Sequence, residues 1–227
     1  MTIEDAVQKC NILCCANIEI QKKIAGIGHV YMQKRGVPIF REREEAGFLY
    51  FVIEGYVIMY RHNHNGDRKN IFIYSKGILL NEVILENPIA SVSAEPLCDS
   101  LILKIPRGDF MEFMKDTDFS QAVFYSAAKK IRKLYHQLAN TSNSFHLEQQ
   151  VLSKLWKLAR DFGVRDEKGI HIPFKISVTL LADMIGAKRE SVSRTVGHLK
   201  KEGLIIYHNG IICILDTDLL LKKISDN

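Results

Sequence analysis

The stretch Ile176–Lys201, ISVTLLADMIGAKRESVSRTVGHLKK, predicts two short helices joined at a glycine. Ser177 and Thr179 are both candidate N-caps of the first helix, because their hydroxyl oxygens can accept hydrogen bonds from free backbone N–H groups. Gly186 allows the chain to turn between the helices, since glycine adopts left-handed backbone angles at little cost. The stretch is therefore typical of a helix-turn-helix.

The second predicted helix has one apolar side and one polar side. Its buried positions recur at helical spacing and are Val192, Val196 and Leu199. The candidate base-reading residues on the other side are Arg189, Glu190, Ser193 and Arg194. Arginine can bond the guanine edge through two N–H groups and glutamate can accept from cytosine, so this side suits reading of DNA bases. The alternative is an ordinary surface helix in which Glu190 and Arg194, one turn apart, pair with each other.

Charge and turn signals around this helix favour DNA binding. Between Lys188 and Lys201 there are five Lys or Arg residues against one Glu. Gly203 predicts a helix C-terminus. The hairpin signal that follows has two apolar runs around Asn209-Gly210, which is typical of a tight turn and completes a winged helix. The candidate phosphate-binding residues are Lys188, Lys200, Lys201, His208 and Asn209.

The hexapeptide at 189–194, Arg-Glu-Ser-Val-Ser-Arg, after Ile185-Gly186, resembles the recognition helix of the Crp/Fnr family of bacterial transcription regulators. The resemblance implies a homodimer that binds a palindromic site in double-stranded DNA, with half-sites like TGTGA or TTGA. Arg189, Glu190 and Arg194 would read bases, with Ser193 in support. RNA polymerase is the further partner that the resemblance implies.

Composition sets broad limits on the class of protein. The 227 residues are 47% hydrophobic and 25% charged, which suits two modest globular domains, and the net charge of +5 permits binding to nucleic acid. No apolar run approaches the roughly 18 residues of a membrane span, so we expect a cytoplasmic protein. None of the motifs HExxH, GxSxG or GxGxxG is present, and we expect no enzyme.

Short β-rich runs occupy the region from Val30 to Pro106, which predicts a sandwich or barrel. Leu49–Ile53 reads as a strand with Tyr56–Arg61 as its hairpin partner. The pattern G-x10-G-x2-YFVIEG, which begins at Gly36, resembles the β-roll of cyclic-nucleotide-binding domains and Crp/Fnr sensors.

The expected effector region departs from relatives that bind cyclic AMP. Those relatives carry Gly-Glu after a strand and later an Arg-Ser or Arg-Thr pair, whereas Ile78 follows Gly77 here and Pro88-Ile89 stands near the expected pair. No arginine lies between Asn70 and Pro106 to pair with a cyclic phosphate. We therefore expect a small, largely apolar organic effector, with a haem-like cofactor as another possibility. The residues predicted to line its pocket are Ile78, Leu79, Leu80, Asn81, Glu82, Val83 and Ile89. The alternative is that they only fill the roll.

The cysteines suggest an alternative kind of regulator. Cys10, Cys14 and Cys15 lie in a helical lead-in that extends to about Gln33. They are small buried residues or, with Cys98, candidate ligands of a metal or an iron–sulfur cluster. A cysteine-based redox or iron–sulfur regulator of the same family is therefore the alternative function.

A long helix is predicted to join the domains. Its apolar residues alternate three- and four-residue steps, as in a coiled-coil seam, and are Phe124, Ala127, Ile131, Leu134, Leu138, Thr141 and Phe145. We expect an α+β chain in three parts: a β-roll (double-stranded β-helix) sensor domain at 1–116, a dimerisation helix and hinge at 117–145, and a winged helix-turn-helix domain at 146–227.

Overall fold

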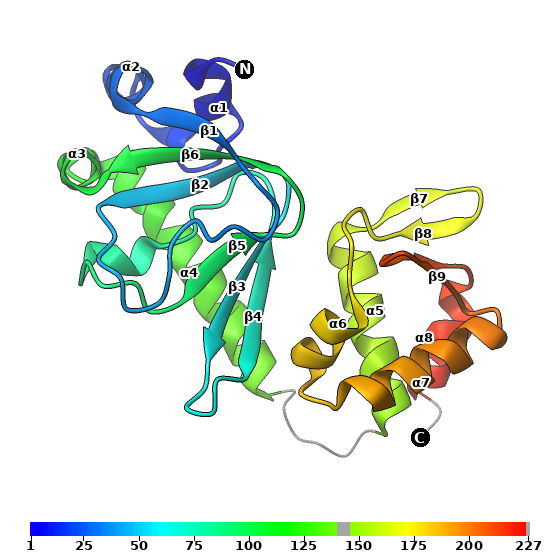
Figure 1. The fold of residues 1–227 in the computed structure, drawn as a ribbon. Helices are drawn as coiled ribbons and strands as arrows, with labels where there is room; N and C mark the ends of the chain where they lie inside the picture. Colours follow the sequence, from blue (N-terminus) through cyan, green and yellow to red (C-terminus); the bar gives the residue numbers. More distant parts are fainter. Residues whose placement is uncertain (140–145, 226–227) are drawn as a thin grey trace. The chain divides into compact units, whose positions relative to one another are not determined.

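The computed structural model describes residues 1–139 and 146–225 (Figure 1). Two compact units divide the chain: residues 1–61 with 71–142, and residues 62–70 with 143–227. The long helix α4 (Thr117–Ala139) belongs to the first unit, together with the β-roll. The predicted hinge and the seam residues Thr141 and Phe145 lie outside the described residues.

The N-terminal segment forms α1 (Ile3–Gln8), the 3₁₀ turn η1 (Leu13–Cys15) and α2 (Ile18–Ile27). The side chain of Asn17 caps α2 by accepting from the N–H of Ile20 at 2.9 Å. The prediction of helix as far as Gln33 was wrong, because β1 (His29–Gln33) follows directly. Gly28 makes this exit possible, since a Cβ there would lie 2.7 Å from the carbonyl oxygen of Ile24.

Two three-stranded antiparallel sheets build the roll, with strand orders β1-β6-β2 and β4-β3-β5 (Figure 1). Their further strands are β2 (Phe48–Glu54), β3 (Val57–His62), β4 (Arg68–Tyr74), β5 (Ser93–Pro96) and β6 (Ser100–Pro106). The 3₁₀ turn η2 (Glu82–Leu85) lies between β4 and β5. The β-roll predicted from the sequence is confirmed.

Alternation along β2 sends side chains into two separate cores. Leu49, Phe51 and Ile53 join the core beneath the N-terminal helices and α3 (Arg107–Phe113). Val52 points the other way, into the interior of the roll. That interior is filled by the buried side chains of Phe40, Val52, Val57, Met59, Tyr74, Leu80, Ala90, Ala94 and Ile102.

The predicted hairpin between Leu49–Ile53 and Tyr56–Arg61 was wrong. β2 pairs with β6, and β3 pairs with β5 in the other sheet. Gly55 turns the chain from one sheet to the other, with a φ of 97°. A Cβ on Gly55 would lie 2.1 Å from Oγ of Ser100, so the close approach of the chain also requires glycine.

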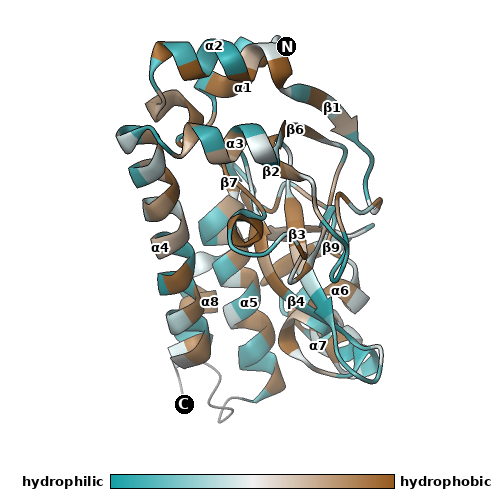
Figure 2. Cartoon of the chain, turned by 90° about the vertical axis from the view of Figure 1, so that its left-hand side faces the viewer, coloured by the Kyte–Doolittle hydropathy of each residue, from teal (hydrophilic) through white to brown (hydrophobic). Residues whose placement is uncertain are grey.

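Helix α4 begins where the sequence predicted, because Asp116 accepts from the backbone N–H of Phe119 at 2.9 Å. Its first two turns are anchored by the buried side chains of Phe119 and Val123. Farther along, hydrophobic residues recur at intervals along the helix (Figure 2). Phe124 and Leu138 are 68% and 67% exposed, so this unit alone leaves the apolar stripe uncovered.

The second unit holds α5 (Leu147–Phe162), α6 (Val178–Ile185), α7 (Arg189–Lys201) and α8 (Thr217–Ser225). Its sheet has the order β7-β8-β10-β9, formed by β7 (Val164–Asp166), β8 (Gly169–His171), β9 (Ile205–His208) and β10 (Ile211–Ile214). α5 packs against the other three helices. None of the described helices is long and apolar enough to span a membrane.

Candidate DNA-binding surface

The turn between α6 and α7 follows the sequence signals closely. Ser177 caps α6 by accepting from the N–H of Leu180 at 3.0 Å. Gly186 ends α6 in the left-handed conformation, with a φ of 80°. The N–H groups of Gly186 and Ala187 both bond the carbonyl oxygen of Ala182, which closes the C-terminus of the helix. The turn fixes the direction in which α7 leaves.

Helix α7 packs through Val192, Val196 and Leu199, which are at most 3% exposed. The four predicted base-reading residues, Arg189, Glu190, Ser193 and Arg194, are all exposed. Within the described part of the chain their side chains form no ion pair or hydrogen bond. Glu190 and Arg194 thus do not pair with each other, and both remain available to a partner.

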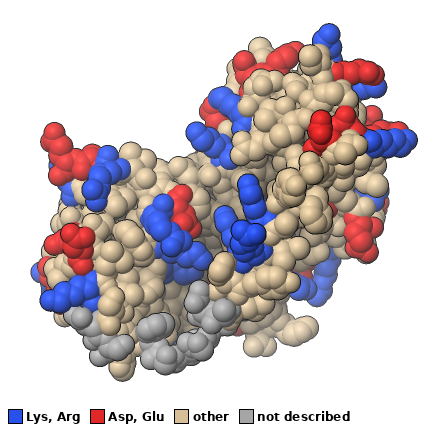
Figure 3. Space-filling view, turned by 180° about the vertical axis from the view of Figure 1, so that it is seen from behind, with Lys and Arg blue, Asp and Glu red and all other residues tan. Residues whose placement is uncertain are grey.

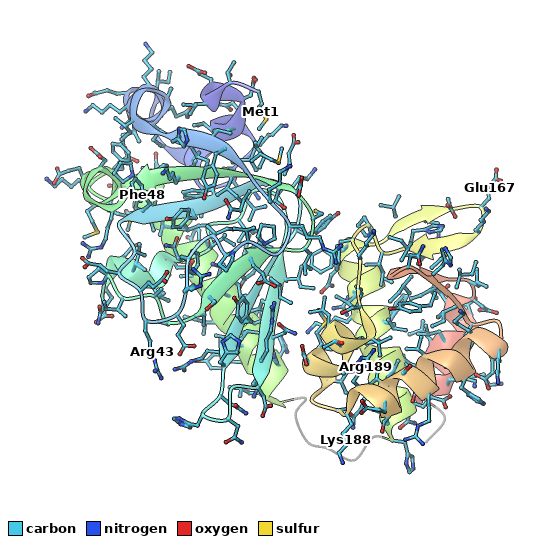
Figure 4. All side chains as sticks on the ribbon, viewed as in Figure 1. Met1, Arg43, Phe48, Glu167, Lys188 and Arg189 are labelled. Carbon is cyan, nitrogen blue, oxygen red and sulfur yellow. The ribbon has the colours of Figure 1, made fainter. Side chains whose placement is uncertain are left out.

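The first turn of α7 adds an electrostatic feature that the sequence reading missed. Lys188 occupies the N-cap position in an extended conformation, and no side chain caps the helix there. Uncapped N–H groups and the helix dipole favour an anion at such an end. Lys188 and Arg189 lie at this end of α7 (Figure 4), so phosphate is a suitable partner.

The predicted wing is the β9–β10 hairpin. His208 and Ile211 pair directly, so Asn209 and Gly210 form a two-residue turn with φ angles of 50° and 81°. His208 and Asn209 are exposed, and their side chains lie 3.1 Å apart. The wing therefore presents polar groups at its tip.

The three predicted phosphate-binding lysines, Lys188, Lys200 and Lys201, are exposed and form no ion pair with any described residue. Elsewhere the positive charge is dispersed: on the face shown in Figure 3, Lys and Arg side chains alternate with Asp and Glu. Local charge on α7, rather than one large basic surface on that face, is what could attract DNA.

The sequence did not predict an ion-pair cluster that lies at the C-terminal end of α7. Lys223 of α8 bonds Glu202 at 2.7 Å and lies 3.6 Å from Glu148 of α5. The Lys223 bond holds the pKa of Glu202 below its ordinary value. His198 lies 3.7 Å from Glu148. Among described residues, Glu148, His198 and Glu202 form the one group spaced to hold a metal, but both carboxylates already have the Lys223 ammonium as a partner.

The residues predicted to line an effector pocket do not surround one cavity. Leu79 and Leu80 fill different cores, and Ile78 packs at the edge of the roll interior. Asn81 is buried and bonds the backbone of Tyr50 and Phe48. The sequence did not reveal the strand partners, and these decide the core that each side chain enters.

Two of the remaining three predicted pocket residues, Val83 and Ile89, are exposed and line an open hollow of about 510 Å³. Arg43 and Arg61 line the same hollow. Arg61 bonds Glu42 at 2.7 Å. The stretch from Asn70 to Pro106 itself contains no arginine, but distant segments of the chain bring two guanidinium groups to this hollow.

Glu82 contacts a third cation that comes from α4. Lys130 Nζ lies 2.5 Å from Glu82 Oε2 and 2.5 Å from the carbonyl oxygen of Leu79. The ammonium also lies 4.8 Å from the centre of the Tyr74 ring. Both charged side chains are nearly buried, at 13% and 12% exposure. Burial lowers the pKa of Lys130, although the Glu82 carboxylate opposes the shift.

The cysteines are separated by burial. Cys10 is buried, Cys98 is half-buried beside Ser100, and Cys14 and Cys15 are exposed. No three of these thiols lie within ligand distance of one another in the described residues. The candidate ligand set for a metal or an iron–sulfur cluster is thus not brought together within this chain.

Comparison with known proteins agrees with this architecture. A family model described as a cyclic nucleotide-binding domain matches residues 33–117, and one described as a Crp-like helix-turn-helix domain matches residues 149–223. The chain is 22% identical over 191 residues to the CRP-like cAMP-activated global transcriptional regulator of Mycobacterium tuberculosis, covering 83% of this chain and 85% of that one. It is 23% identical to the HTH-type transcriptional regulator ArcR of Staphylococcus aureus, over 76% and 74% of the two chains.

Solved structures show the same fold. A CRP-family regulator from Thermus thermophilus aligns with a TM-score of 0.74 and 23% identity, over 88% of this chain and 97% of that one. FixK2 from Bradyrhizobium japonicum aligns with a TM-score of 0.72 and 18% identity, over 86% and 96%.

A β-roll, a long helix and a winged helix, together with the matches to both family models, make this chain a DNA-binding transcription regulator rather than an enzyme. The two family models identify it further: the chain belongs to the Crp/Fnr family.

Proposed function

We propose that this regulator binds a palindromic promoter site as a dimer and responds to an effector that is not a cyclic nucleotide. The observation that carries the DNA-reading part is the free polar side of α7, where Arg189, Glu190 and Arg194 are exposed and unpaired among the described residues. Ser193 lies one turn from Arg189 and supports it, and Lys188, Lys200, Lys201, His208 and Asn209 contact phosphates. The regulator would act in the cytoplasm and contact RNA polymerase at its promoters.

Arg194→Ala should weaken binding to the preferred site by about 1–3 kcal/mol and relax selection at one G·C pair, because a bidentate contact to guanine is lost. Lys200→Ala is the matched control on the same helix, and it should weaken all sequences alike and reduce the salt slope by about one. Binding of wild type and variants to a randomised DNA library, followed by sequencing, measures both effects. If Arg194→Ala keeps the base preference of the wild type, α7 is not the helix that reads the DNA bases.

The apolar stripe on α4 supports the dimer. Phe124, Ile131, Leu134 and Leu138 are exposed in the single chain, and Ala127 between them is half-buried. Two winged helices must be held roughly 34 Å apart to reach successive major grooves. A seam along a helix of 23 residues can pair two copies in parallel and set this separation.

The filled interior of the roll supports the effector proposal. A cyclic phosphate needs a cation that it can reach. Lys130 already has Glu82, a carbonyl oxygen and the Tyr74 ring around it. Arg61 lies 2.7 Å from the Glu42 carboxylate and Arg43 lies 4.0 Å from it. A small, largely apolar molecule, or a haem-like cofactor, would need no such partner, and the pocket for it would open among Ile78, Leu80 and their neighbours.

Isothermal titration of the purified protein with cyclic AMP and cyclic GMP should therefore show no heat at millimolar ligand. The CRP-like regulator of Mycobacterium tuberculosis, described as cAMP-activated, serves as the positive control. Micromolar binding of either nucleotide would show that Lys130, Arg43 or Arg61 pairs with the phosphate, and the effector proposal would fall.

A further inference from the structure

Cys14 and Cys15 form an exposed pair of adjacent thiols in η1. The turn that carries them is well held: the N–H of Cys14 bonds the carbonyl oxygen of Cys10 at 3.0 Å, and the Cys15 thiol donates to the carbonyl oxygen of Asn11 at 3.0 Å. Gln21 donates to the carbonyl oxygens of Cys14 and Ala16 at 3.2 and 2.7 Å. Both thiols are therefore presented to solvent from a fixed backbone.

The two thiols belong to adjacent, exposed residues of the same 3₁₀ turn. Burial, the charge of Cys14 and a hydrogen bond with the Cys14 thiol together raise the pKa of Cys15. Cys10, one turn earlier, is fully buried, and burial raises its pKa to about 12. Neither Cys10 nor any described His, Asp or Glu joins Cys14 and Cys15 to make a third ligand. The pair thus offers two sulfur ligands and no more.

We propose that Cys14 and Cys15 capture thiophilic trivalent arsenicals. Zinc and iron–sulfur clusters need four ligands, whereas a monosubstituted arsenic(III) centre takes two thiolates and keeps its organic substituent. In the reaction both S–H bonds and the arsenic–oxygen bonds break, two S–As bonds form, and the two thiol protons leave with the oxygen as one water. No oxidant or reductant is needed, because arsenic remains trivalent and the sulfurs are not oxidised.

Binding of the arsenical to Cys14 and Cys15 would alter the structure at the start of α4. η1 packs against α4, and the Asp118 carboxylate in the first turn of α4 contributes to the raised pKa of Cys15. Asn17, two residues beyond Cys15, donates to the Asp116 carboxylate at 2.7 Å, and Asp116 caps α4. Closing an arsenical ring at 14 and 15 pulls on this connection. The effect on DNA binding rests on the proposed role of α4 in the dimer; the capture itself does not.

Phenylarsine oxide added to the full-length protein tests the capture. Intact mass spectrometry should show the mass of one phenylarsine oxide gained, less one water, in wild type and in the Cys98→Ser control. The adduct should fall at least tenfold in both Cys14→Ser and Cys15→Ser, and ethanedithiol should remove it. Because both serines replace exposed side chains, the variants should keep the wild-type circular dichroism spectrum.

Two outcomes would overturn parts of the proposal separately. An adduct that persists in both serine variants, or none in wild type, shows that this pair does not capture arsenicals. A wild-type adduct that leaves promoter affinity unchanged shows that capture is not transmitted to α4. The unmodified protein is measured for DNA binding in parallel, so failure of the proposed regulator function is seen independently of the mass result.

Discussion

Leu138→Glu is expected to convert the dimer into monomers and to abolish binding to the palindromic site. Leu138 is 67% exposed in the single chain and belongs to the proposed seam of α4. In a symmetric dimer the substitution appears twice, so two carboxylates would face each other without a cation. Burying an unpaired charge costs several kcal/mol, enough to lower dimer affinity by about a thousandfold or more. Sedimentation velocity and a DNA shift assay measure the two losses.

Lys129→Glu is the matched control, because it places the same carboxylate on an exposed position of α4 beside the seam. This variant should remain dimeric. Leu134→Glu, one turn before Leu138 on the same stripe, should repeat the monomeric result. If both leucine variants stay dimeric, the subunits meet through another surface.

Lys130→Met should destabilise the first unit by about 3–5 kcal/mol, because Glu82 would be left charged and nearly buried. The loss of the ammonium above the Tyr74 ring adds to this effect. Glu82→Leu combined with Lys130→Met removes both charges and should recover most of the stability, since an apolar pair of similar volume carries no desolvation cost. Differential scanning calorimetry of the single variants and the double variant measures the recovery.

Lys129→Met provides the control for this series as well, since Lys129 is exposed and its neutralisation should shift the melting temperature little. A double variant no more stable than Lys130→Met would contradict the argument. It would show that the charges of Lys130 and Glu82 act independently, and that the cost comes from packing around Tyr74.

The local features of the DNA-binding unit could be predicted from sequence because neighbours in the chain encode them. The Ser177 cap, the left-handed Gly186 and the Asn209-Gly210 turn each depend on a few adjacent residues. Phe124 and Leu138 were likewise found by helical spacing alone. Which surfaces these residues contact in DNA or in a second copy remains a prediction.

The sensor could not be predicted to the same detail because its contacts join distant residues. The pairing of β2 with β6, rather than with the adjacent β3, follows from close packing at Gly55 and Ser100. The partner of Glu82 is 48 positions away in α4, and no local pattern distinguishes Lys130 from the solvent-facing lysines beside it. The division of Leu79 and Leu80 between two cores was not predicted for the same reason.

The long-range pairing of β2 with β6 also affects the order in which the two units fold. Its partners range from Glu54 with Leu101 to Phe48 with Pro106, whereas the β9–β10 hairpin joins residues separated by a two-residue turn. Closing a long loop costs conformational entropy before the contacts between the two strands can form and offset that cost. Topologies rich in such contacts therefore fold slowly. The sensing unit therefore carries the larger entropic barrier, while the winged helix can form early from segments that are adjacent in the chain.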